Sequence, residues 1–365
     1  MTSSSTRTSM TVAVECSRLP HDTRGIGRYV RALLPRLVAQ RADLQLLPFA
    51  RRRAELGDLR AAIAELGLPG DRANVRLFSE LDAGDADLWW YPWNVARPTP
   101  RGGVVVATMH DVAPLAFPDP RRSKWLQNRR WRRLYAATAR RARTIITDSQ
   151  FSASEIHRLL GVSADQLRVV PLAADDITVP APRRDAEVLA RLNVRAPYLL
   201  AVNSADRRKN IALLDRAMPL VAELLPSVRL VMVGARSPAG AAEASWRQPL
   251  GFVSDDDLAA LYRCARAVIV PSLYEGFGLP VLEAMRLGAP VICARTSSLS
   301  EVAGDAALQV SATDERQLAL AIIQLLTNDA LHDSLRRAGQ SRAARYSWDD
   351  TARRTLASFD AALGR

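Results

Sequence analysis

The sequence has 365 residues, which is long for a single hydrophobic core, so two domains are expected. Hydrophobic residues make up 48% of it, but no apolar run approaches the roughly 18 residues of a membrane span. The net charge of +12 is concentrated in residues 1–180, which contain 27 Lys and Arg and 18 Asp and Glu. Such an excess of positive charge is compatible with binding to a nucleic acid, an anionic membrane or a phosphate-bearing substrate.

Residues 1–10 begin with the polar string MTSSSTRTS and are expected to form a disordered tail. Strands and helices then alternate, which is the pattern of a parallel α/β sheet. We expect residues 11–180 to form an N-terminal Rossmann-like domain. Its predicted strands are Thr11–Cys16, Leu44–Phe49, Leu88–Tyr91, Val104–Met109 and Thr144–Thr147.

A proline-bearing stretch, 171–197, leads into a second series of strands and helices, and residues 181–347 are expected to form a C-terminal Rossmann-like domain. Residues 348–365 are expected to form a last helix. The apolar runs of this half predict strands at Tyr198–Val202, Arg229–Val233, Val268–Val270 and Val291–Ala294, and helices at Asn210–Leu225 and from Asp255.

The segment after the apolar run 267–270 carries the most informative pattern of the chain. A glycine-bearing loop follows the strand, and a short helix is predicted from Pro280 to just before Gly288. Glu275 therefore lies in a loop at the carboxyl end of a parallel strand, and Glu283 lies about one turn inside the helix. Glycines let a ligand approach the backbone, and the helix start favours an anion, which together suit a sugar nucleotide. A surface loop with two solvated glutamates is the alternative.

The string EGFGLPVLE at 275–283 resembles the donor-site motif of retaining glycosyltransferases of family 4, which have the GT-B fold. The resemblance implies an α/β protein of two Rossmann-like, doubly wound domains facing each other across a cleft. It implies that the N-terminal domain, 11–180, is the acceptor-side one, that the C-terminal domain, 181–347, binds the nucleotide-sugar, and that the last helix, 348–365, crosses back to the first domain. It implies that Glu275 contacts the transferred hexose, as a catalytic residue, and that Glu283 holds the nucleotide ribose. Phe277, Gly278 and Leu279 of the same string are then donor-binding residues.

The loop after the first strand reads Arg24-Gly25-Ile26-Gly27-Arg28 and leads into a helix from about Tyr29 to Gln40. By itself a lone Gly-x-Gly is a weak motif, and a flexible turn explains it as well. Members of the family carry a GGIGRY-like loop here, which faces the donor pyrophosphate. The resemblance therefore makes Gly25 and Gly27 donor-binding residues, while Arg24 replaces one of the family's glycines.

The opening of the second domain, AVNSADRRKN at 201–210, resembles the family string VGTLEPRKN, in which a basic pair neutralises the diphosphate. Arg208 and Lys209 are the matching positions, and such a pair would stabilise the charge that develops on the leaving group. Asn203 stands where the family has glycine, and Ala205 where it usually has arginine, so Arg207 and Arg208 are candidate substitutes. A solvated helix start is the alternative, although basic residues there oppose the helix dipole.

His110 ends the strand VVVATMH, and from the residues alone it is equally a capped or core histidine. The family has a histidine in this His-Asp position near the sugar, which implies a catalytic role for His110. In the aromatic run WWYPWN, Trp89 and Trp90 are expected in the core or against a sugar. Trp93 and Asn94, beyond the strand end, are expected to line the acceptor side.

Residues 121–143 contain ten Lys and Arg and no acid. On a helix, Trp131, Leu134, Tyr135 and Thr138 would share one face. The pattern indicates a helix that lies on an anionic membrane or grips a polyprenyl-phosphate acceptor, and a solvated basic face is the alternative. The residues expected to make this contact are Trp125, Trp131, Arg129, Arg130, Arg132 and Arg133.

The resemblance covers most of residues 11–350 and implies a retaining hexosyltransferase. Its donor would be a nucleotide-diphospho-sugar, and its acceptor a hydroxyl of a glycan or polyprenyl-linked glycan in surface polysaccharide or lipopolysaccharide synthesis. Members with these motifs are commonly mannosyl- or rhamnosyltransferases, which favours a GDP-linked sugar.

No cofactor or metal is expected, because the chain has basic side chains for the diphosphate and no Asp-x-Asp motif at a strand end. No signal peptide is visible, and the three cysteines show no disulfide framework, so we expect a cytoplasmic enzyme at the inner face of the plasma membrane.

Other functions were weighed. A nucleotide-sugar epimerase or a glycan phosphorylase could share the fold, but the phosphate or cofactor lysine site of a phosphorylase is not found. The charge alone suggests a nucleic-acid-binding protein, yet no recognised motif accompanies it, so no nucleic acid is expected as a partner. An inactive subunit is disfavoured because Glu275, Glu283 and Lys209 are all present.

Overall fold

The computed structural model describes residues 9–22, 25–177, 182–203, 206–234 and 244–365. Residues 1–8 of the expected tail lie outside the described residues, whereas Met10 already belongs to the first strand. Arg24 and Ala205, which were noted as departures from the family strings, also lie outside them. Within the described parts of the chain, no helix is both long enough and apolar enough to cross a membrane.

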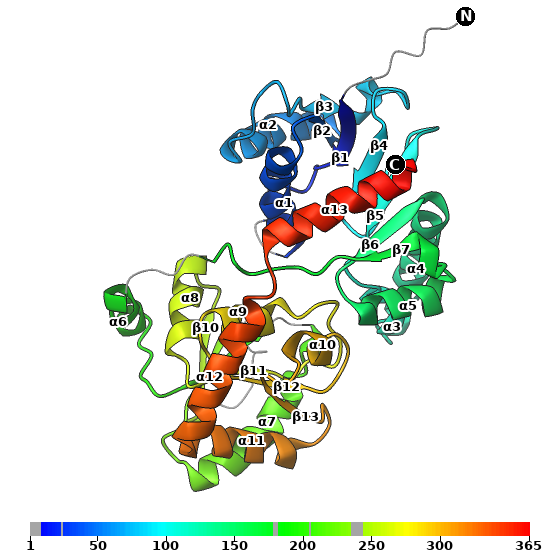
Figure 1. Cartoon of the computed structure of the whole chain (residues 1–365). Coiled ribbons are helices and arrows are strands. Elements are labelled where there is room, and N and C mark those ends of the chain that lie inside the picture. Colours follow the sequence, from blue (N-terminus) through cyan, green and yellow to red (C-terminus); the bar gives the residue numbers. More distant parts are fainter. Residues whose placement is uncertain (1–8, 23–24, 178–181, 204–205, 235–243) are drawn as a thin grey trace, which may run out of the picture. The chain divides into compact units, whose positions relative to one another are not determined.

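The chain divides into two compact units (Figure 1). Unit 1 consists of Met1–Leu172 together with Trp348–Arg365, and unit 2 is Ala173–Ser347. The last helix, α13, therefore belongs to the same unit as the first strand. Each unit is built on one parallel sheet, as the alternation of strands and helices predicts.

Unit 1 has a seven-stranded sheet in the order β3-β2-β1-β4-β5-β6-β7. Its strands are β1 Met10–Glu15, β2 Leu44–Ala50, β3 Arg76–Leu77, β4 Leu88–Tyr91, β5 Val104–Thr108, β6 Thr144–Thr147 and β7 Leu167–Val169. Its α-helices are α1 Ile26–Gln40, α2 Leu56–Glu65, α3 Ala113–Ala116, α4 Trp125–Arg141, α5 Gln150–Leu160 and α13 Trp348–Leu363. The short 3-10 turns are η1 Arg53–Glu55, η2 Phe78–Glu80, η3 Arg122–Lys124 and η4 Ala164–Gln166.

Unit 2 has a six-stranded sheet in the order β10-β9-β8-β11-β12-β13. Its strands are β8 Leu199–Asn203, β9 Leu230–Gly234, β10 Arg247–Gly251, β11 Ala267–Val270, β12 Val291–Ala294 and β13 Leu308–Val310. Its helices are α6 Pro182–Arg191, α7 Ile211–Leu224, α8 Asp255–Cys264, α9 Leu279–Arg286, α10 Leu299–Ala303, α11 Glu315–Thr327 and α12 Asp329–Ala343, with the 3-10 turn η5 Arg207–Lys209.

The aromatic strand β4 is buried on both faces of its sheet. Trp89 packs with Phe49 on one face, whereas Trp90 packs on the other against Tyr29 of α1 and Phe359 of α13. The expected alternation of side chains is therefore present, and both tryptophans lie in the core. Helices α1 and α13 lie side by side over the second face (Figure 1), so the end of the chain completes the core that its beginning starts.

Both strand orders place a topological switch point in the middle of the sheet, where chain connections leave in opposite directions. In unit 1 this point lies between β1 and β4, and in unit 2 between β8 and β11. Ligands of doubly wound sheets bind outside the carboxyl ends of the strands at such points. The loops that follow these four strands are therefore the first places to look for a site.

Candidate active site

In unit 2, the loops after β8 and β11 bring two of the expected site residues into contact. The Lys209 ammonium lies 2.7 Å from Oε1 of Glu275, and the Ser272 hydroxyl donates to the same oxygen over 2.7 Å. The Glu275 side chain is only 13% exposed, so these bonds are shielded from bulk water. The switch point of unit 2 thus holds a fixed carboxylate next to a cation.

The backbone around Glu275 is fixed as firmly as its carboxylate. Its N–H donates to the Ser297 hydroxyl over 3.0 Å, and its carbonyl oxygen accepts from the Ser298 hydroxyl over 2.9 Å. Asn210, in the loop after β8, donates from its side-chain amide to the carbonyl oxygen of Pro271, in the loop after β11. The same amide also donates to the carbonyl oxygen of Ala312, in the loop after β13. The carboxylate therefore sits on a loop tied at both sides, which is the preorganisation that a binding site needs.

The helix start beside this carboxylate depends on a glycine. Gly278 caps α9 with φ of +104°, and an added Cβ would lie 2.8 Å from the Leu299 side chain. Leu279 begins the helix and is half-buried, with Pro280 next to it. Phe277 is buried, its ring edge-on to that of Tyr346. The loop that carries Glu275 thus makes a tight turn at Gly278 and leads directly into the amino end of α9.

Glu283 lies on α9, half-buried, and accepts a hydrogen bond from the Tyr262 hydroxyl over 3.1 Å. Arg208, the other member of the basic pair, is held differently from Lys209. Its guanidinium bonds to the carboxylate of Asp206, which also caps η5 through the Arg208 backbone N–H. Burial disfavours the charged form of Asp206, but its bonds to Arg208 hold its pKa below the ordinary value. Part of the Arg208 charge is therefore already neutralised, and Lys209 is the cation nearest to Glu275.

In unit 1, the glycines of the first loop shape the start of α1. Gly25 is its N-cap, with φ of +57°, and nothing lies within 4 Å of an added Cβ. Gly27 is more constrained, because a Cβ there would lie 1.7 Å from the carbonyl oxygen of Asp22. The helix begins at Ile26, three residues before the expected start, so Gly27 lies inside its first turn. Close packing of the loop on the helix therefore requires glycine at position 27.

His110 is buried, and both of its ring nitrogens have partners within unit 1. Nδ1 lies 2.8 Å from Asp148 Oδ2, and Nε2 lies 3.0 Å from the carbonyl oxygen of Pro92. Burial opposes the charged ring, but Asp148 and the Pro92 carbonyl together raise the pKa of His110 above its ordinary value. Two acceptors facing two nitrogens favour the doubly protonated imidazolium. The ring therefore has no nitrogen free for a sugar in this arrangement, and its edge contact with Tyr29 joins the loop that follows β5 to helix α1.

The two residues expected on the acceptor side have structural partners. Trp93 is 3% exposed, and its indole N–H donates to the Glu15 carbonyl oxygen over 2.7 Å. It is thus a buried residue within unit 1, and the carbonyl oxygen of Glu15 on β1 satisfies its polar atom, while its place on the acceptor side stays a prediction. Asn94 is half-buried with φ of +64°, and its side-chain oxygen accepts from the His110 backbone N–H. Asn94 therefore holds the His-Asp loop.

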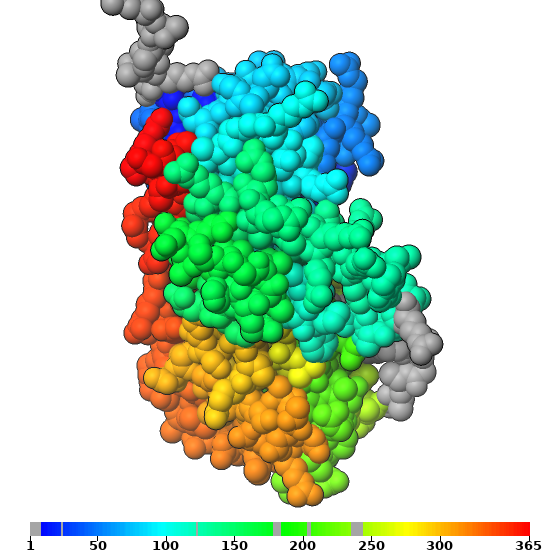
Figure 2. All heavy atoms as spheres, turned by 90° about the vertical axis from the view of Figure 1, so that its right-hand side faces the viewer, coloured from blue at the N-terminus to red at the C-terminus, as the bar shows by residue number. Residues whose placement is uncertain are grey.

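The basic helix α4 is amphipathic and has the apolar face expected, but that face is not open to a membrane. Tyr135 and Thr138 are buried, and Trp131 is half-buried and packs on the same core, so this side is covered by unit 1 itself. The exposed apolar residues are Trp125, 57% exposed, and Leu126, 71% exposed. In Figure 2 the blue-green segment that contains α4 lies on the outer surface of unit 1. The expected arginines, Arg129, Arg130, Arg132 and Arg133, are all exposed.

Two family models match this chain, one in each half of the sequence. Residues 189–342 match the family described as Glycosyl transferases group 1, and residues 23–177 match Glycosyltransferase Family 4. O-antigen chain mannosyltransferase B of Escherichia coli is 33% identical to this chain over an alignment of 270 positions, and the match covers 70% of this chain and 69% of that protein. The chain belongs to glycosyltransferase family 4.

This family 4 glycosyltransferase is also similar to a longer mannosyltransferase in sequence and to a solved structure in fold. The serotype-specific mannosyltransferase WbdA of Escherichia coli is 28% identical over 70% of this chain, which spans only 33% of that longer protein. The solved structure of Anabaena Alr3699/HepE in complex with UDP-glucose superposes with a TM-score of 0.70 over 96% of this chain and all of that one, at 16% identity. The fold is therefore GT-B, as the sequence predicted.

Several residues of the site were not found from the sequence. Asp148 follows β6 directly, and its place at a strand end was the one signal that could have paired it with His110. Ser272, Ser297 and Ser298 are common loop residues, and only the fold brings them around Glu275. Among the residues that the structure describes, no three His, Cys, Asp or Glu side chains gather in a way that could hold a metal ion.

Proposed function

We propose that this glycosyltransferase moves a hexose, with retention of its anomeric configuration, from a nucleotide-diphospho-sugar to a hydroxyl of a glycan or polyprenyl-linked glycan in surface polysaccharide synthesis. The observation that carries the proposal is the contact between Lys209 and Glu275 at the switch point of unit 2. A sugar has hydroxyls for a carboxylate, and a diphosphate has charge for an ammonium, so the pair suits the two halves of such a donor. The relatives named as mannosyltransferases support mannose, and thus a GDP-linked donor, as the first candidate.

The proposed roles follow from position. Glu275 would accept hydrogen bonds from hexose hydroxyls, and Glu283, eight residues further along the chain on α9, would bind the nucleotide ribose. Lys209 and Arg208 would hold the diphosphate, with the Arg208 charge shared with Asp206. The contributions of Phe277, Gly278 and Leu279 to donor binding, and of Gly25 and Gly27 to the diphosphate, stay predictions from the family resemblance.

His110 enters the proposal as a positioning residue. Its ring holds Asp148 and the Pro92 carbonyl, and its backbone holds Asn94 and the Ser152 hydroxyl, so it ties together loops that follow β4, β5 and β6. For the His110 ring to contact the sugar directly, it would have to lose its hydrogen bond either to the Asp148 carboxylate or to the Pro92 carbonyl oxygen. We therefore propose that His110 keeps the acceptor-side loops in place.

The proposed chemistry is a front-face substitution. The bond from the anomeric carbon to the phosphate oxygen breaks, and a bond from that carbon to the acceptor oxygen forms on the same face. The departing phosphate oxygen takes the proton of the acceptor hydroxyl, so no other base is needed. Two hydrogen bonds to Oε1 of Glu275 reduce its strength as a nucleophile, which favours this route over a covalent glycosyl-enzyme intermediate.

A donor screen tests the proposal. The purified chain is incubated with GDP- and UDP-linked hexoses, with and without a mixed glycan acceptor, and release of the nucleoside diphosphate is measured. GDP-mannose is expected to be consumed fastest, and NMR of the product should show the anomeric configuration of the donor. The Glu275→Ala variant is the background control. Turnover that yields the inverted product, or no release from any nucleotide sugar, would overturn the proposal.

We also propose that α4 brings the enzyme to an anionic membrane. Trp125 and Leu126 form an exposed apolar end, and the Arg129 guanidinium lies 5.3 Å from the centre of the Trp125 ring. Beside them a shallow pocket of about 210 Å³ is lined by Arg97, Leu126, Arg129, Arg130, Arg133 and Leu134. Apolar residues beside exposed arginines are what a helix needs to lie at a headgroup surface.

A further inference from the structure

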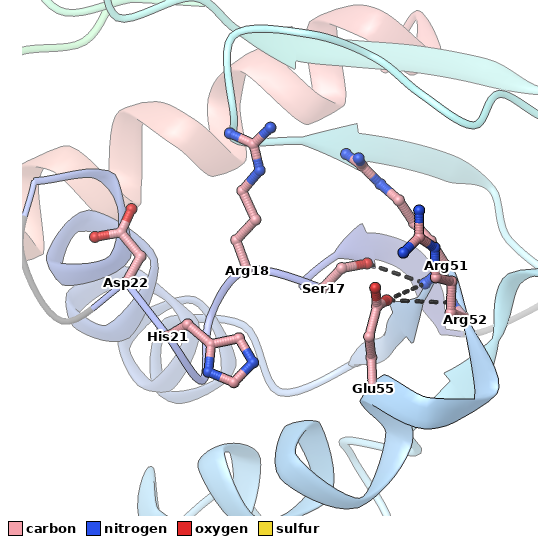
Figure 3. Close-up of a pocket in the computed structure, with 7 residues that line it drawn as sticks. All are labelled: Ser17, Arg18, His21, Asp22, Arg51, Arg52 and Glu55. Carbon is pink, nitrogen blue, oxygen red and sulfur yellow. Dashed lines mark hydrogen bonds between the residues drawn. The ribbon is translucent and has the colours of Figure 1, made fainter.

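A second cationic pocket lies in unit 1, at the carboxyl ends of β1 and β2. Its volume is about 420 Å³, and its walls are the loop that follows β1 and the loop and turn η1 that follow β2 (Figure 3). None of the residues expected to bind the donor or contact the sugar lines it. The lining residues are Ser17, Arg18, His21, Asp22, Arg51, Arg52 and Glu55.

Three guanidinium groups line this pocket, and two of them make no ion pair or hydrogen bond with another described residue. Figure 3 shows Arg18, Arg51 and Arg52 extending to the same side of the two loops. Arg18 and Arg52 are exposed, and neither side chain makes an ion pair or hydrogen bond with another described residue. Arg51 is half-buried, with Nε 3.1 Å from the buried Glu15 carboxylate. The Glu15 carboxylate offsets one of these three charges, which leaves an excess of positive charge for an anion.

The carboxylates of the pocket do not neutralise these two arginines. Oε2 of Glu55 accepts the backbone N–H groups of Arg51 and Arg52, each over 3.1 Å, which turns it towards the loop backbone. Asp22 lies at the far end of the β1 loop from Arg51 and Arg52 (Figure 3). The pocket thus presents guanidinium groups on one side, with its acids bound or distant.

The two loops are fixed before any ligand arrives. The Arg51 backbone N–H donates to the Ser17 hydroxyl over 3.0 Å, and the Ser17 N–H donates to the Glu15 carboxylate over 3.1 Å. The β1 loop also closes on itself, because the His21 N–H donates to the Arg18 carbonyl oxygen over 3.1 Å. A preorganised site loses less entropy on binding than two free loops would.

We propose that this pocket binds a phosphoryl group carried by the acceptor. This assignment rests on the proposed function, because it needs an acceptor other than the donor that unit 2 is proposed to hold. Guanidinium groups bind phosphate oxygens in pairs, and a phosphate offers more oxygens and more charge to three arginines than a carboxylate does. The phosphoryl group can come from a lipid-linked diphosphate or from a phosphate substituent on the glycan, and the test separates the two sources.

The experiment uses the full chain with Lys209→Ala, so that the proposed donor site does not compete for the probe. Binding of inorganic diphosphate, methyl phosphate and acetate is measured by calorimetry at low salt. The test variant is Arg18→Gln with Arg52→Gln. The matched control is Arg53→Gln with Arg60→Gln, which removes the same charge from exposed neighbours outside the pocket. Circular dichroism checks that both variants are folded.

Loss of two charge-assisted contacts should weaken binding of the phosphate probes by about tenfold or more in the test variant, while the control changes by less than about twofold. Tighter binding of diphosphate points to a lipid-linked diphosphate, and equal binding of methyl phosphate to a substituent on the glycan. Equal loss in test and control variants, or acetate bound as tightly as phosphate, would overturn the assignment.

The two proposals can fail separately. In the otherwise wild-type chain, the test variant should keep its acceptor-independent hydrolysis of the donor, because Arg18 and Arg52 are not part of the proposed donor site. If the wild-type chain hydrolyses no nucleotide sugar, the proposed function fails, whatever the phosphate probes do. If donor hydrolysis is normal and the phosphate probes do not distinguish test from control, only the pocket assignment fails.

Discussion

Lys209 and Glu275 form one charge pair, so a change at Glu275 alters both the hexose contact and the surroundings of the cation. Glu275→Ala should lower kcat by about 100-fold, close to 3 kcal/mol in the barrier, because the proposed contact is to the reacting sugar. Glu283→Ala should act mainly on the donor KM, since its carboxylate is proposed to meet the ribose. Steady-state kinetics with a varied donor separate the two effects. Equal and small losses of kcat/KM in both variants would contradict these roles.

The leaving diphosphate is proposed to be stabilised by side chains, with Lys209 as the principal cation. Activity should therefore persist after treatment with EDTA and fall by about 100-fold in Lys209→Ala, as expected when one preorganised charge is removed from a developing anion. Nucleotide release is measured in both cases. Arg208→Ala should have a smaller effect, because Asp206 already shares the charge of Arg208. Complete loss with EDTA that magnesium or manganese restores would refute this account.

At the level of elements, the apolar runs predicted the central strands to within a residue or two. The strands that were missed, such as β3 and β7, are short and lie at sheet edges, where one partner strand leaves less apolar pattern in the sequence. The motif at 275–283 was placed correctly because glycine and proline mark its loop and helix start. The serines that hold Glu275 carry no such local signal, since they act through contacts between loops that only the tertiary fold creates.

The orientation of α4 shows the limit of helical periodicity. The sequence grouped Trp131 with Tyr135 as one apolar face, and that grouping is right, but periodicity does not say what covers a face. In the structure the face packs on the core of unit 1, so the exposed apolar contact falls instead to Trp125 and Leu126 near the start of the helix. The arginines are exposed as expected.

The start of α1 offers a test of local packing. Gly27→Ala would push a methyl group into the Asp22 carbonyl oxygen and should lower the free energy of unfolding by about 1–3 kcal/mol. Gly57→Ala, in α2, is the matched control, because its added methyl meets no atom within 4 Å and alanine favours a helix. Urea unfolding compares the two. A Gly27→Ala variant as stable as Gly57→Ala would show that the loop does not need glycine there.

The proposed membrane contact of α4 is tested with liposomes that contain phosphatidylglycerol. Each arginine near an anionic surface contributes on the order of 1 kcal/mol, so the wild-type chain should co-sediment at low salt and be released as salt rises. Replacing Arg129, Arg130, Arg132 and Arg133 with Glu should abolish this binding and leave donor hydrolysis unchanged. A matched control makes the same charge change at exposed arginines of unit 2, namely Arg316, Arg336, Arg337 and Arg345. Equal loss in both variants, or no binding by the wild-type chain, would leave α4 as a solvated basic face.

At the scale of the whole molecule, each unit has its own hydrophobic core, and helix α13 belongs to the core of unit 1 although it follows unit 2 in the sequence. Helix α13 supplies Trp348 and Phe359 to unit 1, and both side chains are fully buried. The Phe359 ring is 5.5 Å from that of Trp90, on the strand that lies beside the switch point of unit 1. The stability of this unit therefore depends on residues about 270 positions apart along the chain.

Two core truncations should consequently act on different units. Phe359→Ala removes a fully buried ring from unit 1, and Leu214→Ala removes a fully buried side chain from unit 2, each at a cost of about 3 kcal/mol. Urea unfolding is followed by hydrogen exchange and mass spectrometry, which reports each unit through its own peptides. Phe359→Ala should lower the unfolding midpoint for peptides of β1, β4 and β5, and Leu214→Ala that for peptides of β8 and β9. If either substitution lowers the unfolding midpoints of unit 1 and unit 2 peptides equally, the two units unfold as one cooperative body. The core of unit 1, to which α13 contributes, would then not be independent of unit 2.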